Sequence, residues 1–201
     1  MLWTRVSFSI KIDAVGGPGG QIFMNMKKYF ELGMISLLEK DCIDNISVIE
    51  IIEEVGSCKG TFYKHYIDKH DLCLQCLKNQ VYVEIDLTTP DWNSFFMACL
   101  ATFRKSAKVV LHAFESSDIN SVRNYNNAMF TQYLFNLYEK NGGDLSKPLD
   151  KEALTHFATF STDIAMQWLN DGCKVRRESV AMLLQAVAPQ SVYKEIYMQT
   201  I

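Results

Sequence analysis

Residues 46–72 read ISVIEIIEEVGSCKGTFYKHYIDKHDL, a stretch that predicts two short helices joined by a turn at a glycine. Ser47 and Glu50 have the spacing of a capping box, in which the hydroxyl accepts from a backbone N–H and the carboxylate returns to the cap. Gly56 ends the first helix, and the second starts directly after it. This arrangement is typical of a helix-turn-helix unit, although an ordinary helical hairpin has a similar pattern.

The second helix has the composition of a surface that faces a polyanion. No acidic residue occurs between Val55 and Ile67. Gly60 has no side chain, so its backbone can approach another surface closely. The remaining polar side chains are cations, a titratable histidine and neutral hydrogen-bonding groups, which suits phosphates and base edges: Ser57, Lys59, Thr61, Tyr63, Lys64, His65 and Tyr66.

Helical periodicity continues on both sides of this unit. Apolar residues recur at helical spacing from Met26 onward, and Asp68 is placed to cap a longer helix that runs to Val81. We therefore expect a three-helix head over residues 24–70 and a helical body over residues 71–201. The predicted fold class is all-α.

Residues 46–72 also resemble the signature of the TetR/AcrR transcriptional regulators. That signature contains a Gly-Thr-aromatic-Tyr-x-His-aromatic core followed by Lys-x-x-Leu. It is matched at the right spacing by Gly60, Thr61, Phe62, Tyr63, His65, Lys69 and Leu72. The resemblance covers roughly residues 26–80, and it implies a bacterial DNA-binding regulator, with repression as the expected sign.

The resemblance implies contacts with double-stranded operator DNA. Lys59, Thr61 and Lys64 would face the major groove, and Lys69 would bind a phosphate beside a helix N-terminus. Tyr63 and His65 would reach phosphates or nearby bases, but each has a structural alternative: packing between helices for the tyrosine, and partial burial for the histidine. The full set of expected DNA contacts is Ser47, Ser57, Lys59, Gly60, Thr61, Tyr63, Lys64, His65 and Lys69.

Cysteine positions leave several alternatives open. Ser57 and Cys58 stand where the family has Val and Ser, and because Cys is a weaker N-cap, Ser57 is a candidate cap one residue earlier. Cys58 at a helix N-terminus could have a lowered pKa and respond to oxidants. Cys73 and Cys76, with His70 nearby, form either a metal or redox site or two packed thiols. We expect no metal and no cofactor.

Charge limits how the head can hold DNA. The whole chain has a net charge of −3, and residues 21–82 contain seven lysines against nine acidic residues, a net charge of −2. Because phosphate contacts contribute through counterion release, one head should bind weakly. A homodimer would double the contacts and would prefer a near-palindromic operator with two half-sites on one DNA face.

The body is predicted to supply dimerisation. Asp91 is placed to cap the first of its helices, a second helix covers Ser121 to Glu139, Pro148 begins a long helix, and the last helix ends before Pro189. The last two long helices have wide apolar arcs, which suggests a four-helix bundle with a second chain. The expected interface residues are Leu154, Phe157, Ile164, Trp168, Val180, Leu183, Leu184 and Val187.

Residues 168–172 resemble one subgroup of the family, which includes regulators encoded beside dihydroxyacetone-kinase genes. In the family, a small molecule enters the middle helices and changes the spacing of the two heads. An apolar pocket with one or two polar anchors would hold such an effector, although aromatic stripes more often form core. The candidate lining residues are Phe95, Phe103, His112, Phe114, Tyr125, Met129, Tyr133 and Phe160.

The first residues do not share the helical pattern. Residues 6–13 alternate apolar and polar side chains as a strand does, but we find no second strand pattern to pair with them. A Gly-Gly pair can be encoded by a purine-rich ribosome-binding sequence, and one lies a few codons before Met24. Residues 1–23 are therefore either a mis-called leader before a true start at Met24 or Met26, or a disordered arm.

Composition excludes several classes of protein. Apolar residues make up 48% and charged residues 21%, and no apolar run approaches the roughly 18 residues of a membrane-spanning helix. Six scattered cysteines indicate a cytoplasmic protein with reduced thiols. No phosphate loop or Ser/His/Asp spacing supports an enzyme. The alternative to a DNA-binding regulator is a helical interaction protein that keeps the head but acts through a protein partner.

Overall fold

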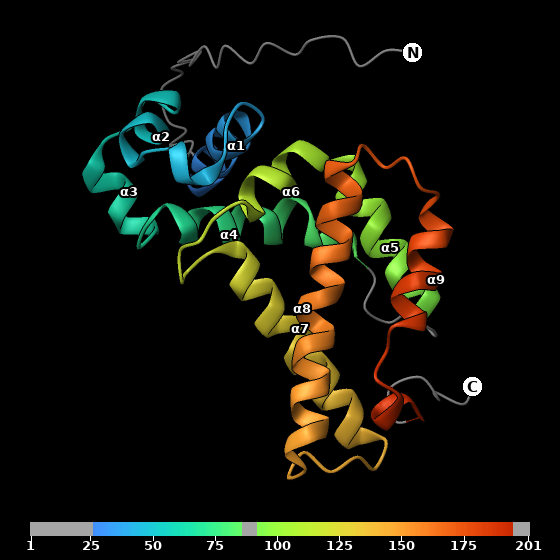
Figure 1. Ribbon diagram of the computed structural model, residues 1–201. Coiled ribbons are helices and arrows are strands. Elements are labelled where there is room, and N and C mark those ends of the chain that lie inside the picture. The colour runs from blue at the N-terminus through green and yellow to red at the C-terminus, as the bar shows by residue number, and fades with distance from the viewer. Residues whose placement is uncertain (1–25, 86–91, 195–201) are drawn as a thin grey trace, which may run out of the picture.

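A computed structural model describes residues 26–85 and 92–194 of the 201-residue chain. Within these ranges every regular element is a helix, which confirms the all-α prediction (Figure 1). No helix in the described ranges is long and apolar enough to cross a membrane. The expectations for residues 1–23 and for a cap at Asp91 lie outside the described residues.

Three helices make the head: α1 (Met26–Leu38), α2 (Val48–Glu54) and α3 (Lys59–His65). The predicted capping box is present, because the Glu50 amide donates to Ser47 Oγ at 3.2 Å and the Ser47 amide donates to Glu50 Oε2 at 2.7 Å. This reciprocal pair fixes where α2 starts and exposes Ser47 beside it.

Aromatic side chains fill the centre of the head. Phe30 and Phe62 are fully buried and meet edge to face with ring centroids 5.5 Å apart, and Tyr66 packs on both. A Cβ placed on Gly33 would lie 2.4 Å from Val55 Cγ1, so only glycine lets α1 approach the end of α2 this closely. Gly56 follows with a φ of 62°, a left-handed conformation that ends the helix as predicted.

Helix α4 (Lys69–Gln80) connects the head to the body. Asp68 caps it as predicted, accepting from the Asp71 amide at 2.8 Å. Along its length α4 packs against α1, and its last turn is tied there by the buried carboxylate of Glu31. That carboxylate accepts from Asn79 Nδ2 at 2.8 Å and from Gln80 Nε2 at 3.4 Å. The end of α4 is therefore joined to α1 by polar as well as apolar contacts.

Helices α7 (Val122–Lys140) and α8 (Pro148–Asn170) run side by side as a long pair, and α9 (Arg177–Ala186) packs against α5 (Trp92–Lys105) (Figure 1). The sequence predicted these helices, and the structure adds that Ser121 caps α7, accepting from the Asn124 amide at 3.3 Å. The remaining α-helix in the described part of the body is α6 (Ala107–Phe114). The short 3₁₀ helices are η1 (Ile43–Asn45), η2 (Tyr82–Glu84) and η3 (Gln190–Val192).

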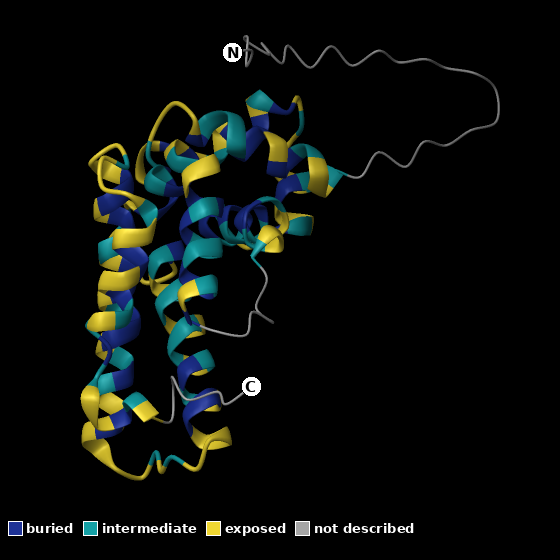
Figure 2. Ribbon diagram, turned by 90° about the vertical axis from the view of Figure 1, so that its right-hand side faces the viewer, coloured by how far each residue is buried: buried dark blue, intermediate teal, exposed yellow. Residues whose placement is uncertain are grey.

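The structure corrects the predicted dimer interface. The apolar arcs of α8 and α9 face other helices of the same chain, so most of the predicted set is used inside one protomer. Figure 2 shows exposed residues on the outer sides of the body helices and buried residues between them. Five predicted interface residues are buried in this way: Leu154, Phe157, Trp168, Val180 and Leu184. Three retain exposed surface: Ile164, Leu183 and Val187.

Candidate nucleic-acid interface and ligand pocket

Helix α3 presents an exposed face without acidic residues. Lys59, Gly60 and Lys64 are exposed, and Thr61 and His65 are half-buried. Tyr63 is 57% exposed, although its ring packs edge to face on Phe62 at 5.1 Å. One side of the tyrosine ring therefore packs on Phe62, but the side chain is not enclosed between helices. Its hydroxyl can reach an external partner.

The N-cap of α3 is Cys58, which corrects the candidate cap at Ser57. The Ser57 amide donates to Ile52 O at 2.9 Å, so this residue still belongs to the turn that closes α2. Helical bonding begins at Cys58 O, which accepts from the Phe62 amide at 3.1 Å. Hydrogen bonds from the side chain and backbone of Thr61 lower the pKa of the exposed Cys58 thiol. Ser57 remains half-buried at the turn.

Lys69 has a structural role that the sequence did not predict. Its Nζ donates to Ile43 O at 2.8 Å and to Asp44 O and Ile46 O, each at 3.0 Å. An ammonium has three N–H donors, so these contacts leave none for a phosphate. We therefore remove Lys69 from the set of candidate DNA contacts and assign it to the loop between α1 and α2.

Replacing Lys69 by Met should destabilise the head, because three carbonyl groups lose their donor while the aliphatic stem is kept. We expect a loss of about 1–3 kcal/mol in the free energy of unfolding. Urea denaturation measures this loss, with Lys174→Met, an exposed lysine in the α8–α9 loop, as the control. Equal stability of the two variants would contradict the structural role.

Three acidic residues near the helix-turn-helix unit are engaged in contacts with neighbouring groups. Glu50 completes the capping box of α2, and Asp68 caps α4. Glu54 accepts from Ser36 Oγ at 2.6 Å and lies 3.7 Å from the Lys40 ammonium. These carboxylates stabilise helix ends and helix contacts, so the net charge of −2 does not describe the face of α3.

The two cysteines of the CxxC pair are packing residues. Cys73 and Cys76 are fully buried between α4 and the head. Burial raises the pKa of the Cys76 thiol to about 12, and Cys76 Sγ donates to Glu31 O at 3.5 Å. No group of three potential metal ligands occurs among the described residues. The geometry favours the packed-thiol interpretation over a metal or redox site.

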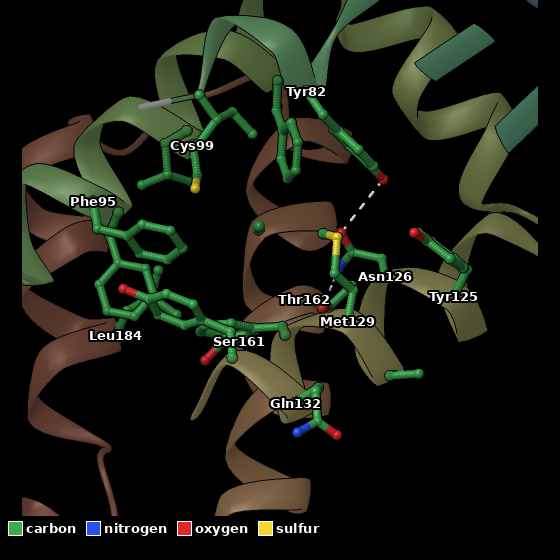
Figure 3. Close-up of a pocket in the computed structure, with 18 of the residues that line it drawn as sticks. Tyr82, Phe95, Cys99, Tyr125, Asn126, Met129, Gln132, Ser161, Thr162 and Leu184 are labelled. Carbon is green, nitrogen blue, oxygen red and sulfur yellow. Dashed lines mark hydrogen bonds between the residues drawn. The ribbon is translucent and has the colours of Figure 1, made fainter. Parts of the chain in front are cut away.

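The body contains a pocket of about 560 Å³, within the usual size range of small-molecule sites (Figure 3). Five of the eight predicted lining residues are found there, from α5 and α7: Phe95, Phe103, Tyr125, Met129 and Tyr133. The rings of Phe95 and Tyr133 are nearly parallel, at an angle of 10° with centroids 5.7 Å apart, and they form a flat apolar wall.

Three predicted lining residues lie elsewhere. His112 Nδ1 is 2.7 Å from Leu38 O and joins α6 to the end of α1. Phe114 is buried in the core beside Phe103, with ring centroids 6.3 Å apart. Phe160 is 50% exposed on α8. Their positions follow from which side of each helix meets a neighbour, which a short apolar pattern did not determine.

Other lining residues were missed by the sequence reasoning. They include Tyr82 in η2, Asn126 and Phe130 in α7, and Thr162 in α8. Asn126 and Phe130 directly follow two residues that were predicted, so the available signal was their position on the same side of α7. Lys78 in α4 was also missed, and it adds a charged group to the pocket lining.

Comparisons with known proteins find related transcriptional regulators. A family profile described as "Transcriptional regulator C-terminal region" matches residues 90–190. HTH-type transcriptional regulator SAB2452 of Staphylococcus aureus (strain bovine RF122 / ET3-1) is 31% identical over 143 residues, which cover 67% of this chain and 72% of that protein. This chain belongs to the TetR family of transcriptional regulators. A TetR-family chain is a regulator and not an enzyme.

Two solved structures share the TetR-family fold with this regulator. Dihydroxyacetone kinase operon activator DhaS matches with a TM-score of 0.54 and 14% identity, over 86% of this chain and 98% of that one. The fatty acid degradation regulator FadR from Bacillus halodurans matches with a TM-score of 0.50 and 15% identity, over 87% and 97%. At these identities the likeness establishes the fold alone.

Proposed function

We propose that this TetR-family regulator binds double-stranded operator DNA as a homodimer and represses transcription until a small apolar molecule enters the body pocket. The observation that carries this proposal is the exposed, acid-free face of α3. The proposed DNA-binding head covers residues 24–70, and the proposed ligand-binding and dimerisation body covers residues 71–201. The proposed DNA contacts are Ser47, Ser57, Lys59, Gly60, Thr61, Tyr63, Lys64 and His65.

Each proposed contact follows from the chemistry of its side chain. Lys59 and Lys64 supply cations for phosphates or guanine edges, and the Thr61 methyl group can meet a thymine methyl. The exposed Tyr63 hydroxyl is a neutral donor for a phosphate oxygen. Gly60 has nothing within 4 Å of an added Cβ, so its surface is open to a partner.

Dimerisation is proposed to use the outward apolar residues of α8 and α9. Phe160 and Ile164 lie one turn apart on α8, and Leu183 of α9 lies one turn before Val187, the C-cap residue of that helix. Met182 beside them is 66% exposed. Large exposed apolar side chains of this kind are typical of interface residues. This set retains the three predicted residues that the single chain does not bury.

Phe160→Asp combined with Leu183→Asp should convert the dimer to a monomer. Two carboxylates per protomer would be desolvated at the interface, a penalty of several kcal/mol. Light scattering after size exclusion measures the mass, and Ile119→Asp, at an 82% exposed position outside both helices, is the control. A double variant that stays dimeric would place the interface elsewhere.

Ligand control is proposed to act as a population shift. An effector that binds the pocket more tightly at one distance between the two heads of the dimer favours that distance. Repression ends if the two heads at that distance fit the two DNA half-sites less well. Helix α4 carries Lys78 of the pocket lining and is packed on α1, so it offers a direct connection between effector and head.

A gel-shift assay with the DNA upstream of the regulator's own gene tests the proposal. We expect a specific complex at low salt, which Lys59→Ala weakens about tenfold and Tyr63→Phe weakens less, since only a hydroxyl is lost. A confirmed dimer that gives no specific complex would instead favour the interaction protein that acts through a protein partner.

A further inference from the structure

Most polar groups inside the pocket are already paired with one another. Tyr82 Oη donates to Asn126 Oδ1 at 3.4 Å, and Asn126 Nδ2 donates to Thr162 Oγ1 at 3.1 Å, a chain of contacts visible in Figure 3. Gln132 Nε2 donates to Asn136 Oδ1 at 2.8 Å, and the Ser161 hydroxyl donates to Phe157 O at 2.7 Å. These pairs leave mainly aromatic and aliphatic surface for a ligand.

Lys78 is the one charged side chain among the described lining residues. Its ammonium lies 4.4 Å from the centroid of the Tyr125 ring, a cation–π contact that holds the charge beside the pocket wall. In the described part of the chain, no carboxylate lies within 4.0 Å of this ammonium, and the Tyr125 hydroxyl has no hydrogen bond. A cation and a neutral donor are therefore both available at one place.

We infer that the effector is an apolar monocarboxylate, with its hydrocarbon body against the aromatic wall and its carboxylate on Lys78 and Tyr125. This inference rests on the proposed ligand role of the pocket and names the chemical class that fits it. A carboxylate carries one charge and matches one ammonium. A phosphate monoester carries between one and two charges at neutral pH and would be under-neutralised by the same lysine.

The position of Lys78 connects this recognition to the head. The next two residues of α4, Asn79 and Gln80, donate to the buried Glu31 carboxylate of α1. A ligand that draws Lys78 toward the pocket therefore acts on the turn of α4 that is tied to α1. An uncharged ligand of the same shape would fill the pocket but would lack this attachment to α4.

Matched acids and amides test the inference, because each pair differs in charge and hardly in shape. Isothermal titration of the full-length protein would compare 2-naphthoate with 2-naphthamide and decanoate with decanamide, which separates aromatic from alkyl bodies. In at least one pair, the carboxylate should bind about tenfold or more tightly than the amide. Lys78→Met should reduce this ratio to less than about twofold while amide binding is kept, and Lys78→Arg should retain it.

Three results would overturn the inference. They are equal binding of acid and amide to the unmodified protein, an unchanged ratio in Lys78→Met, and no binding of either pair. Lys78→Gln provides a second neutral variant if the Met variant does not fold. Operator binding in the gel-shift assay is measured without any ligand, so failure of the monocarboxylate class is distinguishable from failure of the proposed DNA-binding function.

Discussion

Lys59→Ala combined with Lys64→Ala should weaken operator binding at least about 100-fold, because a dimer loses four cations from its DNA-binding faces. Both lysines are exposed on α3, and neither forms an ion pair within the described residues. Each phosphate contact contributes about 0.9 to the slope of log K against log salt concentration. If all four cations meet phosphates, the slope should become shallower by about 3.6.

Fluorescence anisotropy with labelled operator at several salt concentrations measures both quantities. The matched control is Lys140→Ala with Lys151→Ala, which removes the same charge from exposed positions at the far end of α7 and the start of α8 (Figure 1). The control should keep nearly the full affinity and slope. Equal losses in both double variants would mean that overall charge, and not the face of α3, governs binding.

Phe62→Ala should destabilise the head by about 3–5 kcal/mol, the usual cost of removing a large buried aromatic side chain. The Phe62 side chain is fully buried, with 0% exposure. Its ring contacts those of Phe30, Tyr63 and Tyr66 at centroid distances of 5.5, 5.1 and 5.8 Å. The loss should appear in urea denaturation followed by circular dichroism.

Tyr63→Ala, at the neighbouring exposed position, separates folding from recognition. We expect it to cost less stability than Phe62→Ala, because more than half of the tyrosine surface is already in water. It should still weaken operator binding. Comparable destabilisation by the two variants would show that the Tyr63 ring belongs to the core and that its exposed position is not available for DNA.

Local patterns predicted the helix boundaries of the head well. The capping box at Ser47 and the cap at Asp68 depend on groups within three residues, so sequence spacing alone contains the information. The Ser57 cap was misplaced because Ser57 is held by a bond to Ile52 across the turn, a contact that cap preferences do not include. The role of Lys69 depends on carbonyl groups more than 20 residues earlier, which no spacing rule connects to it.

The body shows what an apolar stripe leaves undetermined. Trp168 and Leu184 were placed correctly on apolar arcs, but the arcs meet other helices of the same chain and not a second protomer. Tyr125, Met129 and Tyr133, spaced one turn apart on α7, do line the cavity, whereas the ring nitrogen of His112 meets a backbone carbonyl of α1. Periodicity gives the buried side of a helix, while its partner depends on tertiary packing.

Operator affinity of Gly60→Ala, measured beside its melting temperature, tests most directly whether α3 meets DNA. The added methyl group has no protein atom within 4 Å, and Ala is the better helix former, so the fold should be unchanged or slightly more stable. If the backbone of α3 lies against the operator, the methyl group should lower affinity by about tenfold or more. Unchanged affinity in an equally stable dimer would contradict the proposed docking of α3 on DNA.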